Sequence, residues 1–507
     1  MSKNMSVDMG LKDGKIFGVH PKMANRHGLI AGATGTGKTT TLKVMAEQFS
    51  DIGVPVFMAD VKGDLSGCCV PGSAGSRFME RMEKIGFEDF SFGGFPLAFW
   101  DMYGETGHPV RTTVSEMGPQ LLSRLMDLSD TQTGVLYMVF KIADDMGLLL
   151  LDYKDLSRMI RFVADNSDEL RAEYGNIATQ SIGAIQRSIL VLEETDASIF
   201  FGEPALKIKD LMRKEDGKGV INILNSTKLM QSPTLYSTFL LWLLSELFEE
   251  LDEVGDPDKP RIAFFFDEAH LLFKDTPKIL IEKVEQVVRL IRSKGVGVYF
   301  ITQSPLDVPE SVLGQLGNRI QHALRAYTPK DQKAVRTTAQ TFRQNPNLDL
   351  ETIITELAVG EAIVSFLDED GAPSVAERVW ILPPKSAFGP ADDADIKKVM
   401  DSSPMSDKYD VEVDRESAYE ILMKKAEKAS KKQEEEDEKI QMEIEAEKLE
   451  KERKSAEKER IAKQKEREKK RRAFKSSALG KSLSSAGSTF GRELGKSVVR
   501  GILGSLK

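Results

Sequence analysis

Residues 32–39 have the types and the spacing that hold phosphate groups. The run Gly-Ala-Thr-Gly-Thr-Gly-Lys-Thr fits the phosphate-loop pattern G-x-x-x-x-G-K-[ST] without a mismatch. Glycines lack a Cβ and let backbone N–H groups wrap closely around phosphate oxygens. We expect Lys38 to reach the β- and γ-phosphates of a nucleotide and the Thr39 hydroxyl to ligate Mg²⁺. The expected nucleotide-contacting residues are Gly32, Ala33, Thr34, Gly35, Thr36, Gly37, Lys38, Thr39 and Thr40.

The segments on either side of this loop favour the same interpretation. Residues 28–31 are typical of a short buried strand, and residues 40–49 are typical of a helix. A strand, a glycine-rich turn and a helix together aim a helix N-terminus at phosphate. The alternative, a chance glycine-rich turn, would not be expected to have these flanks.

A second pair of reactive side chains follows the apolar run at 261–266. We expect Asp267 to hold the Mg²⁺ shell through water, and Glu268 to orient and deprotonate the attacking water. Phosphoryl transfer depends on accurate placement of water and charge, which two neighbouring carboxylates supply. Two solvated acids at a strand end are the alternative. Together with the phosphate loop, the pair predicts an enzyme that uses ATP and Mg²⁺.

Further polar residues are expected at the same edge of the sheet. Gln303 ends an apolar run, where it would sense the γ-phosphate; an amide bonded to backbone is the alternative. Asp60 also ends an apolar run, and we expect it to tune the metal or its water network. Lys62 is expected to be structural. His270 is expected to cap or pack near the site.

Arg289, Arg292 and Arg319 are candidates for stabilising charge in the transition state. Arg289 and Arg292 are three residues apart, hence on one helical face, just before a Gly-Val-Gly turn. An arginine delivered from a neighbouring subunit would couple hydrolysis to the geometry of an assembly. The alternative is a helix with surface ion pairs.

The chain up to residue 390 alternates strand-like and helix-like segments, the rhythm of a parallel α/β sheet. Continuous apolar runs, typical of strands buried on both faces, occur at 54–60, 220–224, 262–267, 298–303 and 320–325. Helical patterns occur at 237–251, 278–292 and 329–340, and a late strand pair at 361–367 and 375–382. Between residues 110 and 206 apolar residues recur at helical spacing, which predicts an all-helical insertion.

The C-terminal part changes in composition. Residues 391–415 are typical of a linker. Residues 416–472 are almost all Glu, Lys, Arg, Ala and Gln, which predicts a lone solvated helix held by ion pairs at three- and four-residue spacing, with a coiled coil as the alternative. Residues 473–507 form a basic amphipathic tail. We expect it to dock on the body or on a sister subunit, with a membrane surface or DNA as the alternatives.

Composition limits the partners and the compartment. The 507-residue chain has a net charge of −9, made of −14 in residues 1–405 and +5 in residues 406–507. A body this acidic is not expected to bind nucleic acid over its whole surface, so any DNA-binding cations must be gathered in one place, such as the inside of a ring. The adjacent Cys68 and Cys69 favour a reducing compartment. We see no signal-peptide pattern and no membrane-length apolar run, and expect a cytoplasmic protein without a transmembrane segment.

Several of these stretches together resemble the HerA/FtsK branch of RecA-like ATPases, and more closely the bacterial HerA-like helicase C-terminal-domain family. The resemblance covers about residues 10–390 and is carried by residues 31–40, 264–270, 290–303 and 316–320, with support from 183–187, 201–206 and 228–233. It implies a hexameric ring that hydrolyses ATP between subunits and moves double-stranded DNA through its pore. By position, Arg292 matches the interface arginine of the family and Gln303 its sensor.

The resemblance predicts a RecA-like P-loop NTPase fold with added segments. The expected division is a first part of the ATPase core (1–109), a helical insertion (110–206), the second part of the core (207–390), a linker (391–415), a charged helical segment (416–472) and a basic amphipathic tail (473–507). The sequence shows neither the N-terminal barrel of HerA nor the membrane spans and winged-helix reader of FtsK, so a nuclease partner does not carry over. A ring ATPase that remodels or assembles protein partners, with one bound through the tail, and a nucleotide-gated scaffold are the alternative functions.

Overall fold

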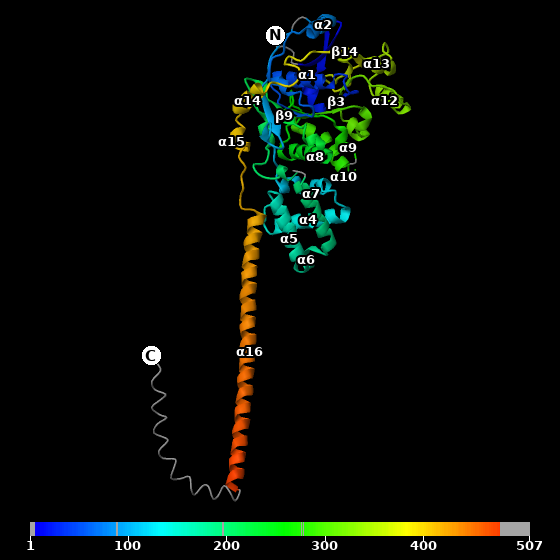
Figure 1. The fold of residues 1–507 in the computed structure, drawn as a ribbon. Helices are drawn as coiled ribbons and strands as arrows, with labels where there is room; N and C mark the ends of the chain where they lie inside the picture. Colours follow the sequence, from blue (N-terminus) through cyan, green and yellow to red (C-terminus); the bar gives the residue numbers. More distant parts are fainter. Residues whose placement is uncertain (1–5, 88–89, 195–196, 275, 277, 477–507) are drawn as a thin grey trace. The chain divides into compact units, whose positions relative to one another are not determined.

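The computed structural model describes residues 6–87, 90–194, 197–274, 276 and 278–476 (Figure 1). The chain divides into two compact units, Met1–Leu422 and Met423–Lys507. The first unit contains the predicted phosphate loop and both predicted carboxylates.

A mixed sheet, with twelve strands among the described residues, forms the centre of the first unit in the order β2-β1-β14-β13-β12-β3-β11-β10-β4-β9-β5-β6. All neighbours from β12 to β6 run parallel. These strands are β3 (Gly28–Ala31), β4 (Val56–Asp60), β5 (Leu97–Asp101), β6 (His108–Pro109), β9 (Ile221–Asn225), β10 (Ile262–Phe266), β11 (Val296–Thr302) and β12 (Asn318–Gln321). The predicted α/β fold with a mostly parallel sheet is confirmed, and the fold is that of a RecA-like P-loop protein.

The other end of the sheet is antiparallel. β13 (Glu361–Ser365) and β14 (Glu377–Ile381) pair with each other as predicted, and β1 (Val7–Lys12) and β2 (Lys15–Val19) extend the sheet beyond them. β1, β2 and β5 were not among the strands predicted from the sequence. In β1 apolar residues alternate with other residues (VDMGLK), so no continuous apolar run marks the strand. A Cβ on Gly10 would lie 2.6 Å from Val379 Cγ2, so the glycine allows the close approach to β14.

Helices cover both faces of the parallel part because its strands are apolar on both faces. α1 (Lys38–Asp51) packs on the face that includes Phe265, whereas Phe264 and Phe266 point to the other face. α8 (Pro233–Glu250) and α10 (Lys278–Leu290) contribute to this second cluster. The first unit also contains the helices α2 (Ser76–Ile85), α9 (His270–Phe273), α11 (Glu310–Leu313), α12 (Pro329–Gln340) and α13 (Leu350–Glu356), and a small hairpin joins β7 (Lys214–Glu215) to β8 (Lys218–Gly219).

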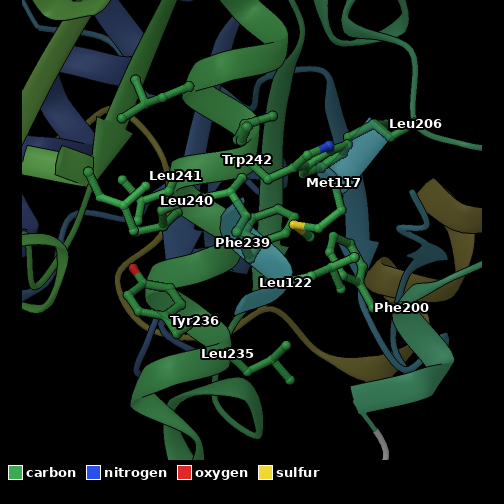
Figure 2. Packing of buried hydrophobic residues seen from close by; sticks show 14 of the residues in the cluster. Met117, Leu122, Phe200, Leu206, Leu235, Tyr236, Phe239, Leu240, Leu241 and Trp242 are labelled. Carbon is green, nitrogen blue, oxygen red and sulfur yellow. The ribbon is translucent and has the colours of Figure 1, made fainter. Parts of the chain in front are cut away.

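α8 is the most deeply buried helix of this cluster, and Figure 2 shows its side chains within the packing. The Trp242 ring meets the edge of Phe200 with centroids 5.4 Å apart. Each aromatic or leucine side chain buried here contributes about 2 kcal/mol through the hydrophobic effect, which explains why an apolar run lies inside the protein. Throughout the described part of the chain, every helix is too short or too polar to cross a membrane.

The predicted helical insertion is helical in the structure. It contains α3 (Val114–Leu125), α4 (Asp130–Asp145), α5 (Tyr153–Asp165), α6 (Ser167–Tyr174) and α7 (Thr179–Glu194). Thr113 caps α3 through a capping box with Glu116, in which each residue's side chain accepts from the other's backbone N–H. Apolar residues of α3, α4, α5 and α7 join the same core cluster as α8.

Residues 391–415 pack on the body more closely than the linker interpretation implies. They contain α14 (Asp393–Asp401) and α15 (Ser406–Tyr409). Tyr409 is fully buried, and the buried His108 ring contacts Asp410 and Ser403, each at 2.7 Å. These contacts attach the segment to the sheet edge at β6.

α16 (Ala418–Ser476) is a single long helix, as the charged composition predicts. Residues 424–474 are exposed, and ion pairs join residues four positions apart, such as Lys451 with Glu447 and Lys463 with Glu459. This pattern stabilises a solvated helix. A coiled coil remains a prediction, and residues 477–507 of the predicted basic tail lie outside the described residues.

Candidate functional site

The phosphate loop connects β3 to α1 at the carboxyl edge of the parallel strands. The two neighbouring strands anchor its base: Gly32 N–H donates to the Thr302 carbonyl (3.2 Å), and Ala33 N–H donates to the Ala323 carbonyl (2.8 Å). Gly37 stands immediately before α1 with φ 114°, a conformation that L side chains rarely adopt. The loop therefore has the shape that its glycines predict.

The Lys38 ammonium points into this loop. Its Nζ donates to the carbonyls of Gly32 (2.6 Å) and Ala33 (3.2 Å). Burial lowers the pKa of Lys38, while the nearby carboxylates of Glu268 and Asp267 oppose that shift. The ammonium is therefore near both the loop and the predicted metal and water residues.

Asp267 follows the fully buried strand β10. Its carbonyl accepts from the Tyr236 hydroxyl of α8 (2.9 Å), and its Oδ1 accepts from the Glu268 N–H (2.8 Å). Burial raises the pKa of Asp267 to about 6, against the opposing effects of that N–H and of the positive charges of Lys62 and Lys38. A desolvated carboxylate of this kind gains stability from a cation, which fits the predicted Mg²⁺ role.

Glu268 has an unusual backbone conformation, with φ 49°. Residues other than glycine adopt this region at a cost and do so often at functional sites. Its Oε2 lies 3.2 Å from His270 Nδ1, so His270 packs beside the site as expected. The same Oε2 is buried and accepts no hydrogen bond from the described residues, so it is placed to accept one from a water molecule.

β11 lies between β3 and β10, so Gln303 follows the strand that separates the loop from the two carboxylates. The Gln303 side chain is exposed at this edge. The preceding Thr302 is buried, and its hydroxyl donates to Asp307 Oδ2 (2.9 Å). The geometry places Gln303 beside the site; its role as a sensor remains a prediction.

Asp60 ends β4, and Lys62 lies in the turn that follows it. The Asp60 carboxylate accepts backbone N–H groups of the turn after β4, from Lys62 (3.2 Å), Gly63 (2.7 Å), Asp64 (3.2 Å) and Leu65 (2.9 Å). Both oxygens of the Asp60 carboxylate therefore hold this turn, and its expected role in tuning the metal or its water network stays a prediction. Lys62, expected to be structural, is close enough to the site to lower the pKa of Asp267 and of Lys38.

Arg292 lies at the opposite, amino edge of the sheet, because it precedes β11 whereas the phosphate loop follows β3. A single chain therefore does not bring Arg292 to its own phosphate loop. Arg292 lines a cavity of about 370 Å³, which we call the arginine cavity. Its cationic lining consists of Arg26, Arg289, Arg292, Arg319 and Arg343, beside the buried His27, and none of the described residues that line it is acidic.

The arginines of this cavity differ in their freedom. Arg319 donates to the carbonyls of Leu316 (3.1 Å), Leu313 (3.0 Å) and Thr341 (3.1 Å), so it holds loops together. Arg292 is half-exposed, and its Nε lies 3.7 Å from Asp256 Oδ1, a weak surface contact. Of the candidates, Arg292 is thus freer than Arg319 to meet a ligand.

Sequence reasoning missed residues that support the site. Tyr236 binds the Asp267 carbonyl from α8, and His322 contacts the phosphate loop from the end of β12. Tyr236 lies in the first turn of the apolar helix α8, and His322 lies within a run that predicts a strand, so their local sequence indicates only burial. Their roles depend on elements that are far apart in the chain.

The fold and the site define a RecA-like P-loop nucleotide-binding protein: a parallel sheet with a glycine-rich phosphate loop after one strand and paired carboxylates two strands away. A family model described as "Helicase HerA-like C-terminal" matches residues 8–507. The chain belongs to this family.

Curated relatives are distant. The DNA double-strand break repair helicase HerA of Sulfolobus acidocaldarius is 21% identical over 345 residues, which cover 67% of this chain and 62% of the relative. HerA of Saccharolobus solfataricus is 22% identical over 349 residues, which cover 67% and 61%. The chain thus spans somewhat less than two thirds of the length of these relatives.

Among solved structures, the bacterial conjugative coupling protein TrwB aligns with a TM-score of 0.49 and 14% identity, over 76% of this chain and 91% of that one. VirB4 of Thermoanaerobacter pseudethanolicus aligns with a TM-score of 0.49 and 15% identity, over 77% and 98%.

Proposed function

We propose that this chain hydrolyses ATP at the carboxyl edge of its sheet and works as a cytoplasmic ring motor that moves double-stranded DNA. The observation that carries the hydrolysis is the meeting of Lys38, Asp267 and Glu268 at one edge, although 229 positions of numbering separate Lys38 from Asp267. Family membership and the names of the HerA relatives support the motor.

The residues present fit a nucleotide with Mg²⁺. The crest of the loop, Thr34 and Gly35, is exposed, so phosphate can reach it. Lys38 would turn from the loop carbonyls to phosphate oxygens, an exchange of acceptors that keeps its charge satisfied. Thr39 and Asp267 would hold the ion, which supplies positive charge to the phosphates when bound.

Glu268 would orient the attacking water and accept its proton at Oε2, the atom that has no hydrogen-bond donor among the described residues. Gln303 would contact the terminal phosphate from the strand between. The positive φ of Glu268 fixes the direction of the carboxylate at a cost in backbone strain.

The position of Arg292 supports an assembly. Because Arg292 and the arginine cavity lie at the amino edge, they would complete a site only on a neighbouring copy. An arginine supplied in this way is worth about 10³-fold or more in turnover. A closed ring, a hexamer by family resemblance, would give every site one such arginine.

The test is ATP turnover with and without duplex DNA, measured beside the mass of the assembly with nucleotide. We expect a ring, and turnover stimulated by DNA. The Glu268→Gln variant, which should bind ATP without cleaving it, is the control. Two results together would favour the protein-remodelling alternative: ATP turnover that does not change when DNA is added, and capture of a protein but no DNA by the Glu268→Gln variant. Wild-type protein that releases no phosphate would refute the hydrolysis itself.

A further inference from the structure

His322 packs against the phosphate loop from the neighbouring strand. It follows β12, is fully buried, and its own N–H donates to the Ala31 carbonyl (2.7 Å) at the end of β3. A Cβ added to Gly32 would lie 2.5 Å from His322 Cβ, and one added to Gly37 would lie 3.6 Å from His322 Cε1. His322 therefore lies against the first glycine of the phosphate-binding motif with its Cα and Cβ, and near the last glycine with its ring.

Both ring nitrogens of His322 have partners on different elements. Nδ1 lies 3.0 Å from the Glu361 carbonyl at the start of β13, and Nε2 lies 2.8 Å from the Thr41 hydroxyl in the first turn of α1. A carbonyl only accepts, so Nδ1 carries the proton and Nε2 accepts from Thr41. The neutral ring thus joins β12, β13 and α1.

A second contact from the same strand end holds the middle of the loop. Gly360 N–H donates to the Thr36 carbonyl (3.1 Å). Arg81 of α2 fixes Gly360 in turn, since its Nη2 donates to the Gly360 carbonyl (3.0 Å) and to the Ile381 carbonyl (2.9 Å). The start of β13 therefore supports the loop both directly and through His322.

We propose that His322 is a positioning residue for nucleotide binding, which holds the phosphate loop in its binding shape before the triphosphate arrives. This rests on the proposed function above. A loop that is already ordered loses less conformational freedom on binding, so its affinity is higher. The ring must be neutral for this role, because Nε2 has to accept from Thr41 and a second cation beside Lys38 would repel it. Burial lowers the pKa of His322 to about 4, and the Lys38 charge acts in the same direction.

Three substitutions separate the two contacts. Asn at position 322 places its amide near the position of Nδ1, so it can still donate to the Glu361 carbonyl. Gln places its amide near the position of Nε2, so it can still accept from the Thr41 hydroxyl. Leu can make neither hydrogen bond. We expect His322→Leu to raise the KM for ATP by roughly tenfold to a hundredfold, the worth of two buried hydrogen bonds. His322→Asn and His322→Gln should each recover part of it, with kcat nearly unchanged in all three. Combining Thr41→Val with His322→Asn should not raise the KM for ATP further, because His322→Asn already lacks the contact with Thr41.

The matched control is His108→Leu. His108 is also fully buried with both ring nitrogens in contact, but it lies at β6, at the far end of the sheet. Its loss should lower the melting temperature and leave the KM for ATP unchanged. A binding titration with a fluorescent ATP analogue, run beside steady-state turnover and thermal unfolding for every variant, gives the readout.

The proposal is overturned if the His322 variants lower the melting temperature while the KM stays at the wild-type value, as a purely structural residue would do. It is also overturned if kcat falls and KM does not. Should His322→Leu not fold, the Asn, Gln and Thr41→Val variants decide in the same way. Wild-type protein that binds no ATP analogue would instead refute the proposed function. The two failures can be told apart, because in that case the His108→Leu control also binds no ATP analogue.

Discussion

The carboxyl edge and the amino edge of one sheet have opposite chemistry. The carboxyl edge combines Lys38 with two carboxylates, Asp267 and Glu268, and with the backbone N–H groups of the loop. The amino edge gathers five arginines around a cavity of about 370 Å³, and within the part of the chain that the structure describes no acidic residue lines it. This concentration occurs in a body whose net charge is −14.

The difference indicates how the work is divided between subunits. The carboxyl edge can bind and orient a nucleotide, but the arginines that would stabilise the transferring phosphate are on the other side of the same sheet. A chain with this layout needs a second copy to complete its chemistry. Each edge also holds one buried neutral histidine, His322 beneath the phosphate loop and His27 at the arginine cavity.

Removing the lysine of the carboxyl edge should have the largest effect. Lys38→Ala deletes the charge that binds the phosphates in both the ground and the transition state, so turnover should fall to background. The fold should survive, because the anchoring bonds of the loop are made by the backbone. Phosphate release and circular dichroism check the two statements, and a variant that unfolds would contradict the role given to Lys38.

Removing the arginine of the amino edge tests the division directly. Arg292→Ala should lower turnover by about 10³-fold while ATP binding persists. Arg336→Ala, an exposed arginine of α12 outside the arginine cavity, is the control. Mixing Arg292→Ala with Lys38→Ala should restore part of the activity, because some interfaces would then join an intact loop to an intact Arg292. If the mixture is as inactive as each variant alone, the two edges do not complete each other's site across a subunit interface.

The two buried histidines predict an acid-sensitive stability. Burial lowers the pKa of both His27 and His322 to about 4, whereas in the unfolded chain it returns to about 6.5. Between these values the unfolded state binds more protons, so stability falls as the pH drops from about 6.5 towards 4, by as much as about 3 kcal/mol per histidine.

His27→Asn isolates one of these contributions, since its amide oxygen can still accept the Val298 N–H that His27 Nδ1 accepts at 3.1 Å. Urea unfolding across this pH range should show a flatter dependence for the variant than for the wild type. An unchanged slope would mean that His27 is not held neutral.

The smallest effect is expected outside both edges. A chain that ends at Leu422 should keep the melting temperature of the body, because residues 424–474 are exposed and ion pairs such as Lys451 with Glu447 and Lys463 with Glu459 lie within the helix. A drop in the melting temperature, measured by calorimetry, would show that the long helix stabilises one of the two edges.

Local sequence patterns predicted much of the fold and the centre of the site. The strand, glycine turn and helix around Lys38, and the apolar strand before Asp267, are short continuous signals, and α12 occupies the predicted residues 329–340. β1 was missed because its apolar residues alternate with other residues and form no continuous apolar run. The bonds from the Asp60 carboxylate to the turn after β4 were missed because the direction of a side chain after a strand depends on the turn that follows it.

The sequence by itself determined that this chain has a phosphate loop, two carboxylates after a buried strand and a parallel α/β body, since each depends on residues within a few positions of one another. Only the tertiary structure decided that Arg292 faces away from its own phosphate loop and that His322 supports that loop. The physical reason is that strand order and the packing of helices on both faces, which bring residues hundreds of positions apart into contact, depend on the whole core and not on any local run of the chain.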